Sequence, residues 1–250
     1  MRARGAGARR KPAAAPPGSG PAGRGRSVDR VGTVTTPTVS LSFDNGPTPG
    51  VTDRVLDVLA RRGVPATFFV IGHKLVEPSG RAAALVERAV AEGHRVGGHT
   101  WSHTVPFGLL PDRAVDRELD DTRAAIERLG GDGLLFRPFG EGGAIDGRLM
   151  SPPGARRLRA GGYTCVLWTS VPGDWRDPTG WPQAALADVA GRDWSVLALH
   201  DLPVGAVDRL DEFLGRLQDL GADLRLDTPD ECTPVRAGVP TSSYHLLGVC

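Results

Sequence analysis

Seven residues of this chain carry side chains suited to metal-assisted or acid–base hydrolysis. In chain order they are a carboxylate beside an amide, two histidines four residues apart, an arginine, a second carboxylate and a third histidine. They are Asp44, Asn45, His99, His103, Arg137, Asp174 and His200. Imidazole nitrogens are common ligands of Zn²⁺, and histidine and carboxylate side chains exchange protons with reacting groups near neutral pH. Each residue alone has an ordinary structural explanation. The prediction of hydrolytic chemistry therefore rests on the whole set.

The segments that precede several of these residues have the composition of buried β-strands. The strands are expected at 39–43, 66–71, 134–136, 164–168 and 195–199. Asp44, Arg137 and His200 come directly after three of them. Barrel enzymes place their catalytic side chains at the carboxyl ends of strands, so this placement favours a shared site.

Amphipathic helical patterns alternate with the strands. They cover 52–62, 81–91, 111–129, 182–190 and 204–220. Strands alternating with helices predict a parallel sheet with crossover connections. About six or seven such units in ~210 residues favour a barrel, although a doubly wound open sheet is an alternative on periodicity alone.

The spacing of His99 and His103 predicts that both imidazoles lie on one side of a helical turn, where they could share a divalent ion. Such a pair is weak evidence by itself. Zn²⁺ is the general expectation for two histidine ligands, and Co²⁺, Ni²⁺ and Mn²⁺ are open alternatives.

The N-terminal region differs from the rest of the chain. Residues 1–26 contain seven basic side chains and no acidic one, which predicts a disordered segment. Residues 27–250 hold 23 basic and 29 acidic side chains, a net charge of −6 that does not indicate a nucleic-acid surface. We expect a basic Arg/Gly/Pro/Ala-rich tail at 1–36, a barrel at 37–230 and a C-terminal tail at 231–250.

No apolar run reaches membrane-spanning length, and the N-terminus lacks the apolar stretch of a secretory signal. The sequence therefore predicts a cytoplasmic protein without a membrane span, an expectation that a misassigned start would change. It does not define an oligomeric state.

Five motifs in family order resemble those of the polysaccharide deacetylases, also called NodB-homology domains or carbohydrate esterase family 4. Ser42–Pro47 resembles T-F-D-D-G-P, and His99–His103 resembles H-[ST]-x-x-H. Phe136–Gly140 resembles R-x-P-[YF]-G, Asp174–Trp175 resembles the end of the D-W motif, and Leu197–His200 resembles L-x-L-H. The resemblance covers about residues 38–228.

The resemblance implies a single-domain, distorted (β/α)₇ barrel that removes N-acetyl or similar acyl groups from an amino sugar or polysaccharide. It implies that Asp44 is the general base and that Arg137 holds it in place. It also implies that His200 is the general acid for the leaving amine and that Asp174 sets its orientation and pKa.

The same resemblance implies a metal site formed by His99, His103 and Asn45. Most family members have aspartate where this chain has Asn45, and a neutral amide oxygen is a weaker ligand. Branches that resemble muramic-acid deacetylases also have F-D-N-G, so Asn45 does not by itself imply inactivity.

The substrate is less defined than the chemistry. Pro138, Phe139 and Trp175 are the expected substrate-binding residues, but the motif around Pro138 is one residue shorter than the common F-R-P-P-Y-G. One alternative is a cytoplasmic amide or imide hydrolase acting on an acylated small molecule, related in mechanism to allantoinase-like proteins. Another is an inactive carbohydrate-binding homologue, motivated by Asn45.

Overall fold

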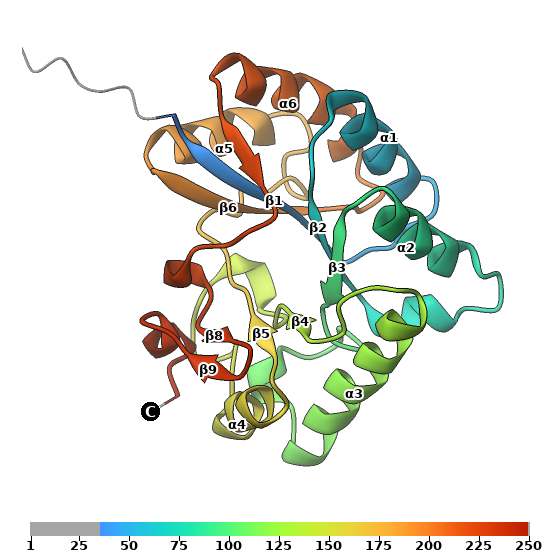
Figure 1. Cartoon of the computed structure of the whole chain (residues 1–250), viewed down its shortest axis with the longest axis vertical. Helices are drawn as coiled ribbons and strands as arrows, with labels where there is room; N and C mark the ends of the chain where they lie inside the picture. The colour runs from blue at the N-terminus through green and yellow to red at the C-terminus, as the bar shows by residue number, and fades with distance from the viewer. Residues whose placement is uncertain (1–35, 250) are drawn as a thin grey trace, which may run out of the picture. The chain divides into compact units, whose positions relative to one another are not determined.

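A curved, largely parallel sheet organises residues 36–249, the part of the chain that this computed structural model describes (Figure 1). Its strands run in the order β6-β1-β2-β3-β4-β5-β8-β9, and β7 pairs with β1. They are β1 (Thr38–Asp44), β2 (Thr67–Val70), β3 (Arg95–Gly98), β4 (Leu135–Phe136), β5 (Thr164–Cys165), β6 (Trp194–His200), β7 (Asp223–Arg225), β8 (Val235–Arg236) and β9 (Val239–Pro240).

Strand β1 has a different neighbour arrangement along each of its two edges. One edge pairs with β6 over seven residues, and the partners at the carboxyl end of this ladder are Asp44 and His200. The other edge pairs with β7 at its start and with β2 at its end. A parallel bridge between Ser170 and Leu197 connects the chain after β5 to β6. The result is the expected distorted (β/α)₇ barrel.

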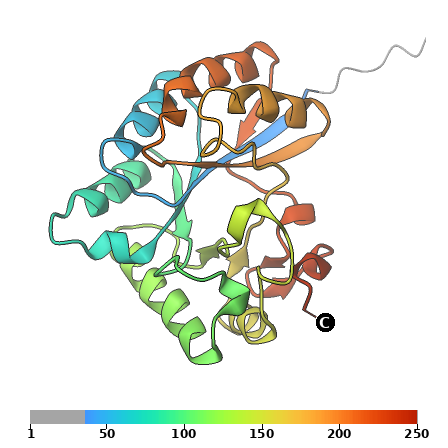
Figure 2. The same ribbon diagram turned by 180° about the vertical axis from the view of Figure 1, so that it is seen from behind.

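Helices pack around the outside of the sheet (Figures 1 and 2). They are α1 (Thr52–Arg62), α2 (Arg81–Ala91), α3 (Asp112–Arg128), α4 (Pro152–Ala160), α5 (Trp181–Ala190) and α6 (Leu210–Asp219). Helix α1 buries Val55, Val58 and Leu59 and is followed by Gly63, which caps it with a φ of 62° that suits glycine. The helix expected at 204–220 is a short 3₁₀ turn, Ala206–Arg209, followed by α6.

The strand expected at 164–168 keeps regular pairing only over Thr164–Cys165. Beyond Cys165 the Val166 amide still donates to the Phe136 carbonyl of β4, but the next groups take other partners. The carbonyl groups of Val166 and Leu167 accept hydrogen bonds from Arg137, and the Leu167 amide donates to the Cys232 carbonyl. The arginine thus occupies carbonyl groups that a continuing strand would have used.

Residues 231–249 continue the fold. Strand β8 pairs antiparallel with β5 and with β9, and Cys232, Val235 and Leu247 are buried in the core. The expected basic tail at 1–36 lies outside the described residues except for Thr36. Within residues 36–249, no helix has both the length and the apolar character needed to cross a membrane.

Candidate active site

Asp44 ends β1 inside the barrel, where it forms a buried ion pair. Its Oδ1 accepts a hydrogen bond from Arg137 Nη1 at 2.7 Å. Arg137 has no exposed surface, and its Nη1 also donates to the Ser42 hydroxyl. Burial alone would raise the pKa of Asp44, but the charge of Arg137 holds that pKa below its ordinary value. Asp44 is therefore an ionised carboxylate that can accept a proton.

His200, at the end of β6, is held by the second carboxylate. Its Nδ1 donates to Asp174 Oδ1 at 2.8 Å, and its backbone N–H donates to Asp174 Oδ2 at the same distance. Burial would lower the pKa of His200, but the hydrogen bond and charge of Asp174 raise it above its ordinary value. The ring of Trp175 packs against His200 with centroids 4.6 Å apart. The Nε2 atom remains as the proton donor.

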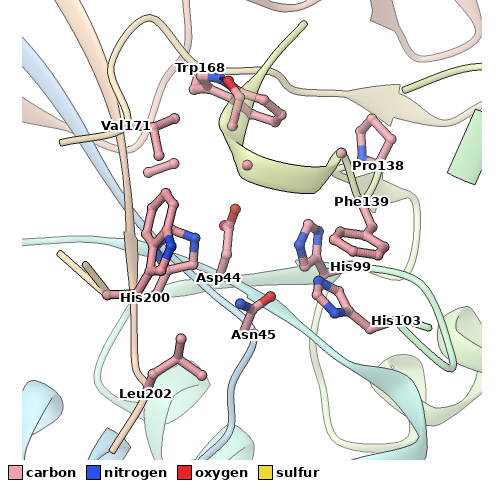
Figure 3. A pocket seen from close by; sticks show the side chains of 15 residues that line it. Asp44, Asn45, His99, His103, Pro138, Phe139, Trp168, Val171, His200 and Leu202 are labelled. Atoms are coloured by element: carbon pink, nitrogen blue, oxygen red, sulfur yellow. Dashed lines mark hydrogen bonds between the residues drawn. The ribbon is translucent and has the colours of Figure 1, made fainter. Parts of the chain in front are cut away.

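The two expected metal-binding histidines lie on the opposite side of Asp44 from His200 (Figure 3). The His99 and His103 ring centroids are 4.9 Å apart. His99 Nδ1 lies 2.9 Å from the Arg137 carbonyl oxygen, which can only accept, so Nδ1 carries the proton and Nε2 keeps its lone pair. Burial lowers the pKa of His99, and it lowers the pKa of His103 to about 3. Both rings are thus neutral, the form that binds metal ions.

Asn45 places a third donor beside this pair. Its Oδ1 is buried, and no described residue donates a hydrogen bond to it. A buried polar oxygen without a partner is costly unless a water molecule or an ion satisfies it. Residues 36–249 contain no group of three His, Cys, Asp or Glu side chains that could hold a metal. An ion here would therefore need the amide oxygen of Asn45 with His99 and His103, and this donor set fits a divalent ion.

The segment joining the two histidines is not the helical turn expected from their spacing. Thr100 and His103 have φ values of 68° and 51°, which a right-handed helix excludes. Each such residue costs on the order of 1 kcal/mol. The expectation was wrong about the backbone, because hydrogen bonds from neighbouring elements shape this loop, yet the imidazoles still meet. Phe139 stacks on His103 with centroids 3.8 Å apart.

A cavity of about 170 Å³ brings most of the predicted residues together. Its lining consists of Asp44, Asn45, His99, His103, Pro138, Phe139, Gly140, Gly142, Gly143, Trp168, Val171, Trp175, Ala198, His200 and Leu202. Arg137 and Asp174 do not line it. They lie behind Asp44 and His200, so they can affect a substrate only through those two residues.

Sequence reasoning did not assign a role to Asp201, which is buried, or to Lys74, which is half-buried. Asp201 lies against the turn after Asp44, and a Cβ atom at Gly46 would come within 2.2 Å of its carboxylate, so only glycine fits there. Burial raises the pKa of Asp201 to about 7. Lys74 Nζ donates to the Asn45 carbonyl at 2.7 Å. Of these two residues, Asp201 had a direct sequence signal, because it follows His200.

Ser42 and Glu118 are two further omissions. Ser42 lies within the first motif, and its hydroxyl donates to the Leu197 carbonyl. Glu118 occupies a buried position on α3 between Val115 and Thr122. A charged residue in register with the apolar positions of an amphipathic helix is the signal that would have found it.

The fold and these contacts define an α/β barrel protein whose polar site lies at the carboxyl ends of its parallel strands. The chain matches the family described as polysaccharide deacetylase over residues 31–144. It is 36% identical to a chitooligosaccharide deacetylase of Sinorhizobium fredii over 181 residues, which are 70% of this chain and 77% of that protein. The chain belongs to the polysaccharide deacetylase family.

The fold is shared with solved structures, among them two family 4 esterases. A family 4 carbohydrate esterase from Streptomyces lividans in complex with acetate is 27% identical, with a TM-score of 0.64 over 80% of this chain and 97% of that chain. A family 4 acetyl xylan esterase from Clostridium thermocellum in complex with a cobalt ion is 30% identical, with a TM-score of 0.61 over 74% of this chain and 86% of that chain.

Proposed function

We propose that this protein is a divalent-metal-dependent hydrolase that removes an N-acetyl or similar short acyl group from an amino sugar. The observation that carries the proposal is the pair of proton-transfer groups on one cavity. Asp44 is held ionised by Arg137, and His200 is held protonated by Asp174. Hydrolysis of an amide needs a base for the attacking water and an acid for the leaving nitrogen.

In this mechanism each buried pair has one task. Asp44 accepts the proton of the attacking water, and Arg137 keeps the carboxylate oriented and charged. His200 then donates its Nε2 proton to the leaving nitrogen, while Asp174 fixes the tautomer through Nδ1. Asn45, His99 and His103 would hold the ion. A divalent ion bound there would polarise the amide carbonyl and lower the pKa of water.

The size of the cavity supports a short acyl group. Its volume of about 170 Å³ is below the roughly 300–1,000 Å³ of pockets that enclose a whole ligand. The cavity can hold the scissile amide and a small acyl group, so the sugar would lie across its mouth. Trp175 borders the cavity and offers a face on which a sugar ring can stack.

The test is metal content of the purified protein, together with acetate release from N-acetylated chitooligosaccharides with and without added Zn²⁺ or Co²⁺. We expect metal-dependent acetate release, and we expect His103→Ala to lose both metal and activity. His245→Ala, at an exposed histidine outside the cavity, is the matched control. Metal uptake without acetate release would indicate a small-molecule amide or imide substrate. Failure to bind metal would favour an inactive carbohydrate-binding homologue.

Asn45→Asp is expected to tighten divalent-metal binding by about tenfold or more, because a carboxylate adds a negative charge where the chain has a neutral amide oxygen. Competition with a chromophoric chelator measures the dissociation constant. An unchanged constant would show that Asn45 is not a ligand.

Asp174→Asn is expected to move the alkaline limb of the kcat/KM profile to lower pH by about one unit. His200 must be protonated to donate, so activity falls as pH rises through its pKa. Asp174 raises that pKa, and removing its charge brings the fall to lower pH. Asp177→Asn, at a neighbouring exposed carboxylate, should leave the limb in place. An unmoved limb in Asp174→Asn would argue against His200 as the acid.

A further inference from the structure

The loop between His99 and His103 holds its shape without regular secondary structure. Thr100 and His103 both have left-handed backbone conformations, and neither is glycine. The Thr100 and Trp101 carbonyls accept hydrogen bonds from the amides of Gly72 and His73, which lie in a 3₁₀ turn, Gly72–Val76. Such a backbone persists only where the surroundings determine it.

The amide groups of this loop converge on one carboxylate. Glu118 Oε2 accepts hydrogen bonds from the backbone N–H groups of Trp101 and Ser102 at 2.7 and 2.8 Å. Glu118 Oε1 accepts from the Ser102 hydroxyl at 2.7 Å. Within residues 36–249, every hydrogen bond of this carboxylate thus goes to Trp101 or Ser102, two of the three residues between the histidines.

Glu118 is buried, so its hydrogen bonds to the loop are the contacts that stabilise its carboxylate. The residue is only 7% exposed, and within residues 36–249 no basic side chain forms an ion pair with it. A buried carboxylate without a cation depends on its hydrogen bonds for compensation. Glu118 sits on α3, whose Thr122 packs beneath Gly98, the last residue of the strand that leads into His99. Helix α3 therefore contacts this segment twice, through Thr122 at Gly98 and through Glu118 at Trp101 and Ser102.

We propose that Glu118 is a positioning residue that presets the separation of His99 and His103 for the divalent ion. This inference rests on the proposed metal site. The carboxylate does not touch the ion or the substrate. It fixes the backbone from which both imidazoles project, so that metal binding does not have to order the loop.

The experiment compares Glu118→Ala, Glu118→Gln and Glu127→Ala in the full-length chain. The glutamine carbonyl oxygen can accept both backbone amides, and its NH₂ group can donate to the Ser102 hydroxyl, so this variant should rescue the alanine defect. Glu127 is on the same helix but is exposed and paired with Arg123, which makes it the control. Co²⁺ dissociation constants and the hydrogen-exchange rates of the Trp101 and Ser102 amides in metal-free protein are the readouts.

Glu118→Ala is expected to weaken Co²⁺ binding by about 10- to 100-fold and to speed exchange at Trp101 and Ser102. Glu118→Gln should stay close to the wild type in both, and Glu127→Ala should match it. Wild-type Co²⁺ affinity in Glu118→Ala would overturn the proposal, as would an equal loss in Glu127→Ala. If Glu118→Ala does not fold, Glu118→Asp, whose shorter side chain withdraws the carboxylate from the loop, takes its place with the same expected direction.

The two proposals can fail separately. If the wild-type protein took up no Co²⁺, the metal-dependent function would fail. The exchange rates of the metal-free protein would then still decide the role of Glu118. Faster exchange confined to the loop would support its ordering by the carboxylate, and unchanged exchange would overturn it.

Discussion

Asp44→Asn is expected to lower kcat for deacetylation by about 100- to 10,000-fold while leaving the divalent ion bound. The amide is nearly the same size as the carboxylate but cannot accept the proton of the attacking water. The side chains assigned to the ion, which are Asn45, His99 and His103, are unchanged. Initial rates of acetate release and metal content, measured on the same preparation, test both halves of the expectation.

Asp57→Asn is the matched control, because Asp57 is an exposed carboxylate on α1 that pairs with Arg88. It should keep wild-type rates. Loss of metal from Asp44→Asn would mean that Asp44 holds the ion as well as the proton. A rate within about tenfold of the wild type would remove Asp44 as the base.

Arg137→Ala is expected to lower the free energy of unfolding by about 3–5 kcal/mol, the cost of leaving a buried carboxylate without its partner. Arg137 is fully buried, donates to Asp44, and lies 4.1 Å over the Phe69 ring. Its other donors reach the carbonyls of Val166 and Leu167. Arg137→Lys should rescue little, because one ammonium group cannot reproduce this planar set of contacts.

Urea denaturation measures the change, with Arg148→Ala as the control at a partly exposed arginine that pairs with Asp146. That variant should stay within about 0.5 kcal/mol of the wild type. The double variant Asp44→Ala, Arg137→Ala should lose less than the sum of the two single variants, because it leaves no unpaired charge. Additive losses would contradict the buried ion pair.

The parts of the site carried by strands were predictable from the sequence. Apolar runs ending in Asp44 and His200 identify strand ends, and parallel strands bring those ends to one edge of the sheet. Helices α1 and α2 begin and end where their apolar spacing predicts. In these segments the residues that the apolar spacing predicts to be buried are the residues that are buried in the structure.

The parts that depend on contacts between distant segments were not predictable in the same way. The spacing of His99 and His103 suggested a helical turn, but the backbone follows hydrogen bonds to Glu118, which lies 15 residues beyond His103. Beyond β5 the carbonyls of Val166 and Leu167 accept hydrogen bonds from Arg137 in place of a neighbouring strand. In both places the backbone is hydrogen-bonded to a polar side chain from a distant part of the chain. The local sequence pattern contains no information about that side chain.

The seven-residue ladder between β1 and β6 fixes the relative position of the two proton-transfer residues. Asp44 and His200 are directly opposed in that ladder, so the span between them is set by the inter-strand spacing. A slip of one residue would turn His200 to the other face of the sheet. Residues 140–143, which also border the cavity, lie outside that ladder and include none of the residues that hold Asp44 or His200. Exchanging this segment for that of a relative is therefore a route to new substrate preferences that leaves the proton-transfer pair untouched.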